Sequence, residues 1–213
     1  MTHLHDSVAS TGQSPRQVRH FVTDRRRFNL SADDLVARAA VAARAGVDVI
    51  QVRERDLEDA ALLALVREIV RVTAGTAARV IVNDRADLAV LAGAAGVHLR
   101  GDSLPAPRVR AVSPPRFVVG RSVHSLAEID AAVAAGGCDY LMFGTVFPSA
   151  GKPAGHPVAG LDALRQACIR SPLPVIAIGG VDEASAPLVR EAGAAGFAAV
   201  GLFTCLTPLP QVV

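Results

Sequence analysis

The segment Pro174-Val-Ile-Ala-Ile-Gly-Gly180 decides the fold, because an apolar, β-branched run ends there in two glycines and a helical segment follows. An uninterrupted apolar run indicates a strand that is covered on both faces. From residue 20 onward, similar runs alternate with segments whose apolar residues recur at three- and four-residue spacing. This alternation predicts repeated βα units and a parallel sheet.

Eight predicted strands indicate that this sheet closes on itself. They cover residues 20–23, 47–53, 79–82, 96–99, 117–120, 140–143, 174–178 and 196–200. Predicted helices cover residues 32–45, 57–72, 87–92, 127–135, 161–169 and 184–192. An open doubly wound sheet usually has a Gly-rich turn after its first strand, and Thr23-Asp24-Arg25-Arg26 is not such a turn. We predict an α/β fold, a single (β/α)8 TIM barrel of parallel strands over residues 20–213, after a flexible N-terminal segment, residues 1–19.

Three of the units share a short signature, in which small residues and a glycine precede a larger apolar residue. The signature occurs as Ala45-Gly46-Val47, Ala95-Gly96-Val97 and Ala195-Gly196-Phe197. We interpret each glycine as the residue that ends a helix and lets the chain turn into the next strand.

Composition and charge argue against several classes of function. The 22 Lys+Arg residues against 20 Asp+Glu leave a net charge of +2, too little for a nucleic-acid partner. The cluster Arg25-Arg26-Arg27 fits either a solvated turn or an anion-facing loop. Cys138, Cys168 and Cys205 form no CxxC pair, so neither a zinc site nor a disulfide framework is indicated. Without a signal-peptide pattern or an apolar run of membrane-spanning length, we expect a cytoplasmic protein with no membrane partner.

Glycines follow the seventh and eighth predicted strands. In barrels of this kind the chemistry lies at the carboxyl ends of the strands, and the loops after strands seven and eight often bind phosphate. Gly179, Gly180 and Gly201 would let the backbone approach a ligand closely and present its amides. They predict a phosphate site, and two glycine turns without a ligand are the alternative.

Polar and charged side chains follow the second predicted strand. Alternation sends Gln51, Arg53 and Arg55 to one side of the strand and Val52 to the other. Guanidinium groups in a barrel mouth need an anionic partner, because an unpaired buried charge is costly. The alternative to an anionic ligand is an internal salt bridge with Glu54 or Asp84.

Further candidates follow strands three to six. Asn83 can donate and accept hydrogen bonds, while Asp84 could ligate a metal, orient an arginine or cap the next helix. His124 is either an acid/base group or a structural residue, and Ser125 is expected to cap the following helix. Lys152 lies on a long loop rich in small and rigid residues, either directed towards the site or exposed at the surface. His98, inside a strand, fits a satisfied core histidine.

Several of these segments together resemble one superfamily. They are Gln51-x-Arg-Glu, Val82-Asn-Asp-Arg-x-Asp-Leu-Ala, Gly96-Val-His-Leu, Gly120-Arg-Ser-Val-His-Ser, Asp139-Tyr-x-x-Phe-Gly-x-Val-Phe and Val175-Ile-Ala-Ile-Gly-Gly. The superfamily is that of thiamine-phosphate synthase and its relative, the TenI-type thiazole tautomerase. The resemblance runs in order from about residue 20 to about residue 203.

The synthase branch joins a pyrimidine diphosphate to thiazole phosphate and needs Mg²⁺, and the chain departs from that pattern at four places. Arg55 replaces a lysine, and Ser103 stands where the second Mg²⁺ carboxylate is expected. Asp84 matches the first carboxylate, and Asp102 could compensate through a shifted loop. In the diphosphate loop Ser149 keeps one hydroxyl while Gly151 loses another, and Gly201 replaces a serine after the eighth strand.

The tautomerase branch shifts a proton on carboxylated thiazole phosphate and needs no metal. The resemblance to this branch lies in Arg53-Glu54-Arg55 and in the run from Gly120 to Ser125. It implies that His124, Arg53 and Lys152 are catalytic. Substrate-binding roles fall on Gln51, Arg55, Asn83, Ser122 and Ser149.

We therefore predict a thiazole tautomerase, an isomerase of thiamine biosynthesis that binds a small phosphorylated thiazole without a cofactor. The first alternative is thiamine-phosphate synthase with Mg²⁺ held by Asp84 and Asp102. The second is a non-catalytic sensor of thiazole phosphate. A homodimer is expected, because Pro208 and Pro210 forbid a long last helix and leave a gap for a neighbouring subunit.

Overall fold

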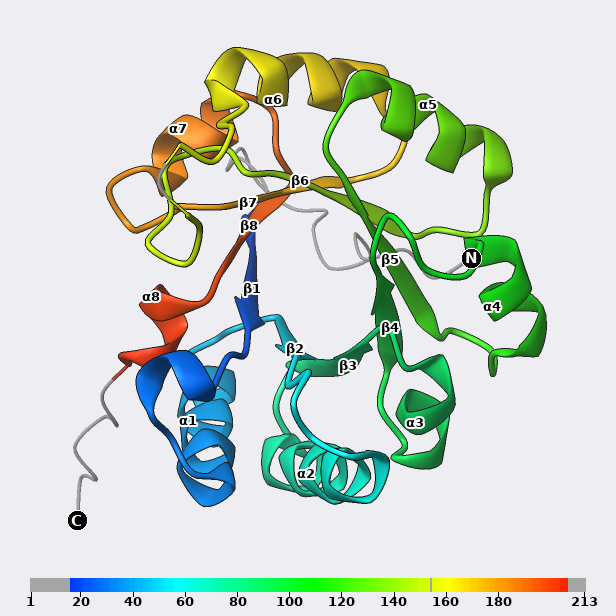
Figure 1. Ribbon diagram of the computed structural model, residues 1–213, viewed down its shortest axis with the longest axis vertical. Helices are drawn as coiled ribbons and strands as arrows, with labels where there is room; N and C mark the ends of the chain where they lie inside the picture. Colours follow the sequence, from blue (N-terminus) through cyan, green and yellow to red (C-terminus); the bar gives the residue numbers. More distant parts are fainter. Residues whose placement is uncertain (1–15, 154, 207–213) are drawn as a thin grey trace.

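The chain forms a closed barrel of eight parallel strands with helices around it (Figure 1), as seen in a computed structural model that describes residues 16–153 and 155–206. The strands are β1 (Val18–Val22), β2 (Val49–Val52), β3 (Arg79–Asn83), β4 (Gly96–Leu99), β5 (Val118–Val123), β6 (Tyr140–Gly144), β7 (Val175–Ile178) and β8 (Gly196–Ala199). Each strand pairs with the next, and β8 pairs with β1 to close the sheet. The predicted TIM barrel is confirmed.

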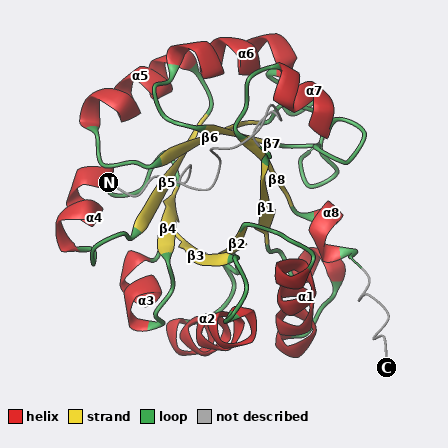
Figure 2. Cartoon of the chain, turned by 180° about the vertical axis from the view of Figure 1, so that it is seen from behind, coloured by secondary structure: helices red, strands yellow, loops and turns green. Residues whose placement is uncertain are grey.

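Helices follow the strands and cover the outside of the barrel, as Figure 2 shows from behind. They are α1 (Ala32–Arg44), α2 (Asp59–Thr73), α3 (Ala86–Leu91), α4 (Ala106–Val112), α5 (Leu126–Ala135), α6 (Gly160–Arg170), α7 (Ala186–Glu191) and α8 (Gly201–Thr204), with a 3₁₀ turn η1 (Arg26–Phe28) after β1. None of the helices in residues 16–153 and 155–206 is long and apolar enough to cross a membrane. Residues 1–15, Pro208 and Pro210, on which part of the sequence interpretation rests, lie outside the described residues.

Two differences from the predicted elements have physical causes. Helix α4 was not predicted from the sequence, because it begins after Pro105, buries only Ala106 and Val109, and so carries no apolar stripe of helical period. Strand β5 extends to Val123 instead of ending at residue 120, because its pairing with β6 continues to the pair Val123 and Phe143. This extension brings His124 directly to the carboxyl end of the strand.

The glycines of the shared signature have two different structural roles. Gly46 has a φ of +81° and follows α1, as predicted. Gly96 and Gly196 are instead the first residues of β4 and β8, so the predicted helix-ending role is wrong for them. A Cβ atom at Gly196 would lie 2.3 Å from the carbonyl oxygen of Val18 on the neighbouring strand. These two glycines permit close strand pairing.

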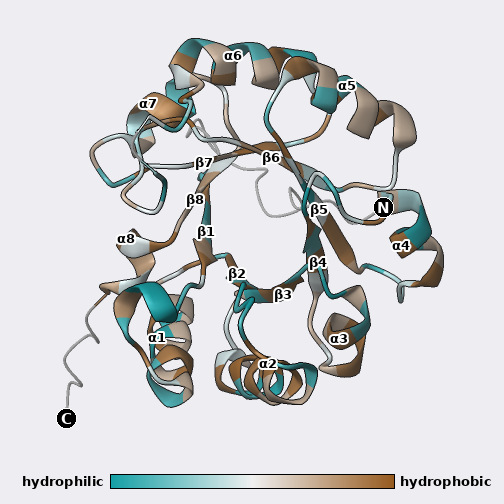
Figure 3. Cartoon of the chain, in the orientation of Figure 1, coloured by the Kyte–Doolittle hydropathy of each residue, from teal (hydrophilic) through white to brown (hydrophobic). Residues whose placement is uncertain are grey.

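The core has two layers. Side chains of the larger layer lie between the strands and the helices, and Figure 3 shows brown, hydrophobic residues along the strands and in bands along the helices. The smaller layer fills the barrel interior and contains Val22, Val49, Ile81, Val118, Tyr140, Met142, Ile176 and Ala198. Strand β2 shows the alternation, because Val49 belongs to the interior layer and Ile50 and Val52 to the outer one.

Two buried histidines extend the interior layer with hydrogen bonds. His20 Nε2 lies 3.1 Å from Gln51 Oε1, and Gln51 Nε2 donates to Asn83 Oδ1 at 3.0 Å. His98 lies between the Tyr140 hydroxyl and the Ser122 hydroxyl, with both of its ring nitrogens in hydrogen bonds. The interpretation of His98 as a satisfied core histidine is confirmed.

Burial of these histidines predicts acid-sensitive stability. Loss of solvation lowers the pKa of both His20 and His98 from 6.5 to about 3, whereas in the unfolded chain they take up protons near pH 6.5. The unfolded state therefore binds more protons between these values, and the free energy of unfolding falls as pH drops through this window. We expect His98→Gln to reduce the slope of that free energy against pH by up to about 1.4 kcal/mol per pH unit. Urea unfolding at a series of pH values measures the slope, and an unchanged slope in both His98→Gln and His20→Gln contradicts this account.

Candidate functional site

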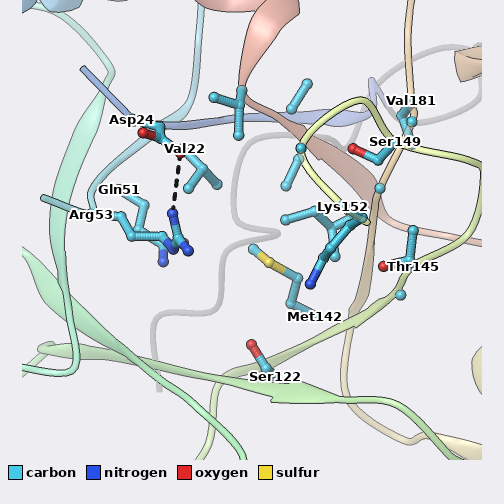
Figure 4. Close-up of a pocket in the computed structure, with 18 of the residues that line it drawn as sticks. Val22, Asp24, Gln51, Arg53, Ser122, Met142, Thr145, Ser149, Lys152 and Val181 are labelled. Atoms are coloured by element: carbon cyan, nitrogen blue, oxygen red, sulfur yellow. Dashed lines mark ion pairs between the residues drawn. The ribbon is translucent and has the colours of Figure 1, made fainter. Parts of the chain in front are cut away.

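A cavity of about 700 Å³ opens at the carboxyl ends of the strands (Figure 4). Residues from nearly every strand end line it, among them Gln51, Arg53, Asn83, His98, Ser122, His124, Gly144, Lys152, Gly179 and Gly201. Helices cover the outside of a (β/α)8 barrel and side chains fill its interior. Polar side chains from distant parts of the chain therefore meet at the carboxyl ends of the strands. Every predicted site residue except Asp84 lines this cavity, and Asp84 lies beside it through its contacts with Arg100 and Ser103.

Strand β2 directs one row of polar side chains to the cavity. Gln51, Arg53 and Arg55 line it, as the alternation predicts, while Val52 packs in the outer core. Arg53 Nη1 lies 3.6 Å from Asp24 Oδ2, so the nearest carboxylate comes from the loop after β1 and not from Glu54 or Asp84. Burial lowers the pKa of the Arg53 guanidinium, and the neighbouring charge of Arg55 adds to this effect.

Glu54 is held away from the cavity. Its carboxylate is buried and accepts the backbone N–H of Arg25 at 3.1 and 3.2 Å, and the Arg25 side chain lies beside it. Burial raises the pKa of Glu54. Arg25 is therefore a structural residue and not part of a solvated turn, whereas Arg27 of the same cluster lines the cavity.

The cavity is cationic. Five cationic side chains line it, namely Arg27, Arg53, Arg55, Arg100 and Lys152. Two carboxylates, Asp24 and Asp102, line it as well. The surplus of positive charge fits an anionic ligand, since like charges placed together repel unless an anion binds between them.

His124 follows β5 at the cavity rim. Its Nδ1 lies 2.6 Å from the carbonyl oxygen of Gly144, and a carbonyl oxygen can only accept a hydrogen bond. The neutral ring therefore carries its proton on Nδ1 and a lone pair on Nε2. The backbone N–H of His124 donates to Glu128 Oε2 at 2.9 Å, and Ser125 caps α5 as predicted. These contacts fix the ring position and leave a basic nitrogen.

The loop after β6 brings Lys152 to the cavity, across from Arg53 (Figure 4). Ser149 and Thr145 lie on the same side. A Cβ atom at Gly151 would lie 2.8 Å from Arg27 Nη1, which is the far end of an exposed and flexible side chain. This contact therefore does not by itself require a glycine at position 151.

Gly179 and Gly180 have a local structural reason to be glycine. Their φ angles are +100° and +64°, and Cβ atoms there would approach Thr145 and the Phe147–Pro148 backbone to 3.0 Å or less. This packing accounts for the two glycines with or without a ligand. Gly201 begins the short helix α8, and the nearest atom to a Cβ there is Phe28 Cζ at 3.6 Å.

Asp84 orients an arginine, one of the three roles considered for it. Its carboxylate lies 3.4 Å from Arg100 Nε and accepts a hydrogen bond from Ser103 Oγ. Helix α3 has Arg85 at its N-cap with no side-chain hydrogen bond, so the capping alternative is wrong. Arg100 also donates to both oxygens of Asp102 at 2.9 and 2.8 Å. One guanidinium therefore bridges the two aspartates.

These residues do not form a Mg²⁺ site in this arrangement. A hard cation prefers several anionic oxygens, but Arg100 lies between Asp84 and Asp102, and Ser103 offers a hydroxyl already used towards Asp84. Within the described part of the chain, no group of three His, Cys, Asp or Glu side chains is placed to hold a metal ion. Cys138, Cys168 and Cys205 are free thiols.

The structure defines a TIM-barrel protein with a cationic cavity at the carboxyl ends of its strands, and comparison with known proteins identifies the family. Residues 19–203 match the family described as thiamine monophosphate synthase. The thiamine-phosphate synthase of Anaeromyxobacter dehalogenans is 44% identical over 162 residues, 76% of this chain and 72% of that protein. The putative thiamine-phosphate synthase of Geobacter sulfurreducens is 40% identical over 182 residues, covering 85% and 84%.

A solved structure agrees with the sequence matches. The thiamine phosphate pyrophosphorylase from Pyrococcus furiosus superposes with a TM-score of 0.73 at 29% identity, covering 86% of this chain and 85% of that one. The chain belongs to the thiamine monophosphate synthase family, a family of thiamine biosynthesis, and the resemblance found in its motifs is confirmed. These relatives carry the names of the synthase branch, whereas the motifs were interpreted as closer to the tautomerase branch.

Three cavity residues were missed from the sequence. Arg100 directly follows β4, so the rule that strand ends carry the chemistry would have found it. Thr145 follows β6 in the same way. Asp24 was given no role, and nothing local in the sequence indicates its pairing with Arg53 across 29 residues of chain.

Because Arg100 lies between Asp84 and Asp102, we predict that the wild type and the Arg100→Ala variant respond differently to Mg²⁺. We expect roughly 10 mM Mg²⁺ to leave the thermal midpoint of the wild type unchanged and to raise that of Arg100→Ala by about 3–6 °C, because binding at roughly tenfold over Kd contributes about 1.4 kcal/mol. Arg170→Ala is the matched control, since Arg170 makes a similar bidentate pair with Asp130 at the surface. A rise in the wild type, or none in Arg100→Ala, shows that Arg100 does not exclude a cation.

Proposed function

We propose that this chain acts on a phosphorylated thiazole in thiamine biosynthesis and moves a proton on that ring, which makes it a thiazole tautomerase. The observation that carries the proposal is His124, a residue that lines the cavity and whose Nδ1–H is held by the Gly144 carbonyl at 2.6 Å, which leaves the lone pair on Nε2. A neutral imidazole of this kind serves as a general base and then, once protonated, as a general acid.

The reaction needs only proton movement. His124 Nε2 takes a proton from one position of the non-aromatic ring, and the resulting imidazolium returns a proton at another position, so no electrons enter or leave. Acid/base help of this kind contributes roughly a hundred- to ten-thousand-fold. The Gly144 carbonyl stabilises the imidazolium through the hydrogen bond that it already accepts.

The other cavity residues bind the anionic groups of the substrate. Arg53, Arg55 and Asn83 lie on the β2–β3 side and suit a ring carboxylate. The phosphate would bind at the Gly179, Gly180 and Gly201 backbone, close to Lys152 and Ser149. Both subsites use positive charge and N–H donors from this chain alone.

Thiamine-phosphate synthase is the second candidate, and the names of the relatives favour it. The chain is 44% identical to one thiamine-phosphate synthase, and Gln51, Arg53, Asn83, Asp84 and Lys152 lie in the segments that resemble the synthase motifs. The arrangement of Arg100 between Asp84 and Asp102 argues against it, because Mg²⁺ would have to displace a guanidinium. A sensor without activity is a third outcome of the same experiment.

Two assays on the purified protein separate these functions. One supplies the non-aromatic carboxythiazole phosphate without metal and follows formation of the aromatic ring. The other supplies thiazole phosphate, the pyrimidine diphosphate and Mg²⁺ and follows thiamine phosphate. Aromatisation at an enzymatic rate supports the proposal, thiamine phosphate at an enzymatic rate overturns it in favour of the synthase, and tight binding of thiazole phosphate without either product identifies a sensor.

His124 has a sharper prediction of its own. We expect His124→Asn to lower kcat for aromatisation by roughly a hundred- to ten-thousand-fold, because the base is lost while the phosphate subsite is intact. Affinity for thiazole phosphate, measured by calorimetry, should change little. His156→Asn is the control, since that histidine lies on the neighbouring loop against Thr145 and does not line the cavity. Full turnover in His124→Asn rules out its catalytic role.

A further inference from the structure

A hydrogen-bonded chain connects the barrel interior to the cavity. The Tyr140 hydroxyl lies 2.9 Å from His98 Nδ1, and His98 Nε2 lies 2.8 Å from Ser122 Oγ. Tyr140 and His98 are 3% and 2% exposed, so neither can exchange these partners for bulk water. Ser122 lines the cavity, and Figure 4 shows its hydroxyl directed into it. The chain ends in a group that a ligand can reach.

Donor counting decides which way the hydrogen bonds run. A neutral histidine carries one N–H, and burial, with smaller contributions from His20 and Arg121, lowers the pKa of His98 to about 3, so the ring is neutral. Within the described residues, the Tyr140 hydroxyl has no hydrogen-bond partner besides His98. A buried hydroxyl without an acceptor costs about 1–3 kcal/mol. Tyr140 must therefore donate to Nδ1, which leaves the ring proton on Nε2.

The Nδ1–H tautomer of His98 would leave one hydrogen-bond donor without an acceptor. If Nδ1 carried the proton, it would donate to the Tyr140 oxygen, and the tyrosine hydrogen would then have no acceptor. The hydroxyl packs against Gly120, where a Cβ atom would lie 2.3 Å from its oxygen, and within the described residues it has no hydrogen-bond partner other than His98. The stacking of Tyr140 on His98, with ring centroids 5.6 Å apart, keeps the two groups in this geometry.

We propose that Tyr140 fixes His98 as the Nε2–H tautomer and thereby makes Ser122 a hydrogen-bond donor to the ligand. Because His98 Nε2–H occupies one lone pair of Ser122 Oγ, the serine O–H is free to turn into the cavity. It then selects a ligand atom that accepts, such as a carboxylate oxygen or an unprotonated ring nitrogen, and disfavours an N–H or O–H at the same place. Tyr140 and His98 are positioning residues that act through Ser122.

This inference rests on the proposed function only for the identity of the ligand. The tautomer itself is a property of the ligand-free protein, so it can be tested whether or not a thiazole binds. Nitrogen-15 NMR of the full chain with labelled histidine reports which ring nitrogen of each histidine carries the proton. The His98 signals are assigned as those absent from His98→Gln.

We expect His98 to be protonated on Nε2 in the wild type and in Ser122→Ala, because Tyr140 and not Ser122 sets the tautomer. Ser122→Ala is thus the matched control. In Tyr140→Phe the constraint is gone, and a mixture of tautomers is expected, with circular dichroism confirming that the barrel is folded. Protonation on Nδ1 in the wild type overturns the proposal, and so does an unchanged pure Nε2–H state in folded Tyr140→Phe.

Affinity gives a second, independent readout. Calorimetry with thiazole phosphate and with its carboxylated form should show that Ser122→Ala weakens binding of at least one of them about fivefold to tenfold, the loss of one hydrogen bond. Tyr140→Phe should weaken the same ligand less, and the double variant no more than Ser122→Ala alone. Additive losses overturn the coupling between Tyr140 and Ser122. If neither compound binds the wild type, the proposed function fails while the NMR result still decides the tautomer.

Discussion

Closure of the sheet by hydrogen bonds between β8 and β1 is the constraint on which the rest of the structure depends. The pairing aligns Val18 with Gly196, and the absence of a side chain at Gly196 allows that contact, since a Cβ would lie 2.3 Å from the Val18 carbonyl oxygen. Gly96 has the same role against β5. A closed sheet has no free edge, and it forces alternate side chains of all strands into one interior. The cavity forms where this shared interior opens at the carboxyl ends of the strands.

The interior changes character along the barrel axis. Towards the amino ends of the strands it holds apolar side chains such as Val49, Val118 and Ile176, which lose little by leaving water. Towards the carboxyl ends it holds Gln51 and His98, whose burial costs free energy unless every donor and acceptor has a partner, and then the partly exposed Arg53. The described residues contain no buried side-chain nitrogen or oxygen without a hydrogen bond. The polar layer is therefore an ordered floor for the cavity.

The sequence predicted the structure correctly where a local pattern determines it, such as the alternation of side chains along a strand or the order of strands along the chain. It predicted the eight strands, the inward row of Gln51, Arg53 and Arg55, and the buried nature of His98. It was insufficient where a contact joins distant segments. Ser103 meets Asp84 across 19 residues and Tyr140 meets His98 across 42, and the spacing of residues along one strand contains no information on such pairs. Helix α4 was missed for a related reason, because it buries too little apolar surface to leave a periodic pattern.

The two halves of the site respond differently to changes in sequence. Under the proposed function, backbone amides at Gly179, Gly180 and Gly201 bind the phosphate, so that this half depends on the path of the backbone and not on particular side chains. The packing of Gly180 against the Phe147–Pro148 backbone preserves that path without a ligand. A divalent cation depends on particular carboxylates, so one serine at position 103 and one arginine at position 100 are enough to alter it. The resemblance to the synthase branch places Mg²⁺ at the Asp84 and Asp102 carboxylates. A related barrel can therefore lose the metal-dependent reaction through changes there and still bind a phosphorylated ring. Under the proposed function, Arg100 supplies with a fixed guanidinium the positive charge that a cation would otherwise bring to Asp84 and Asp102.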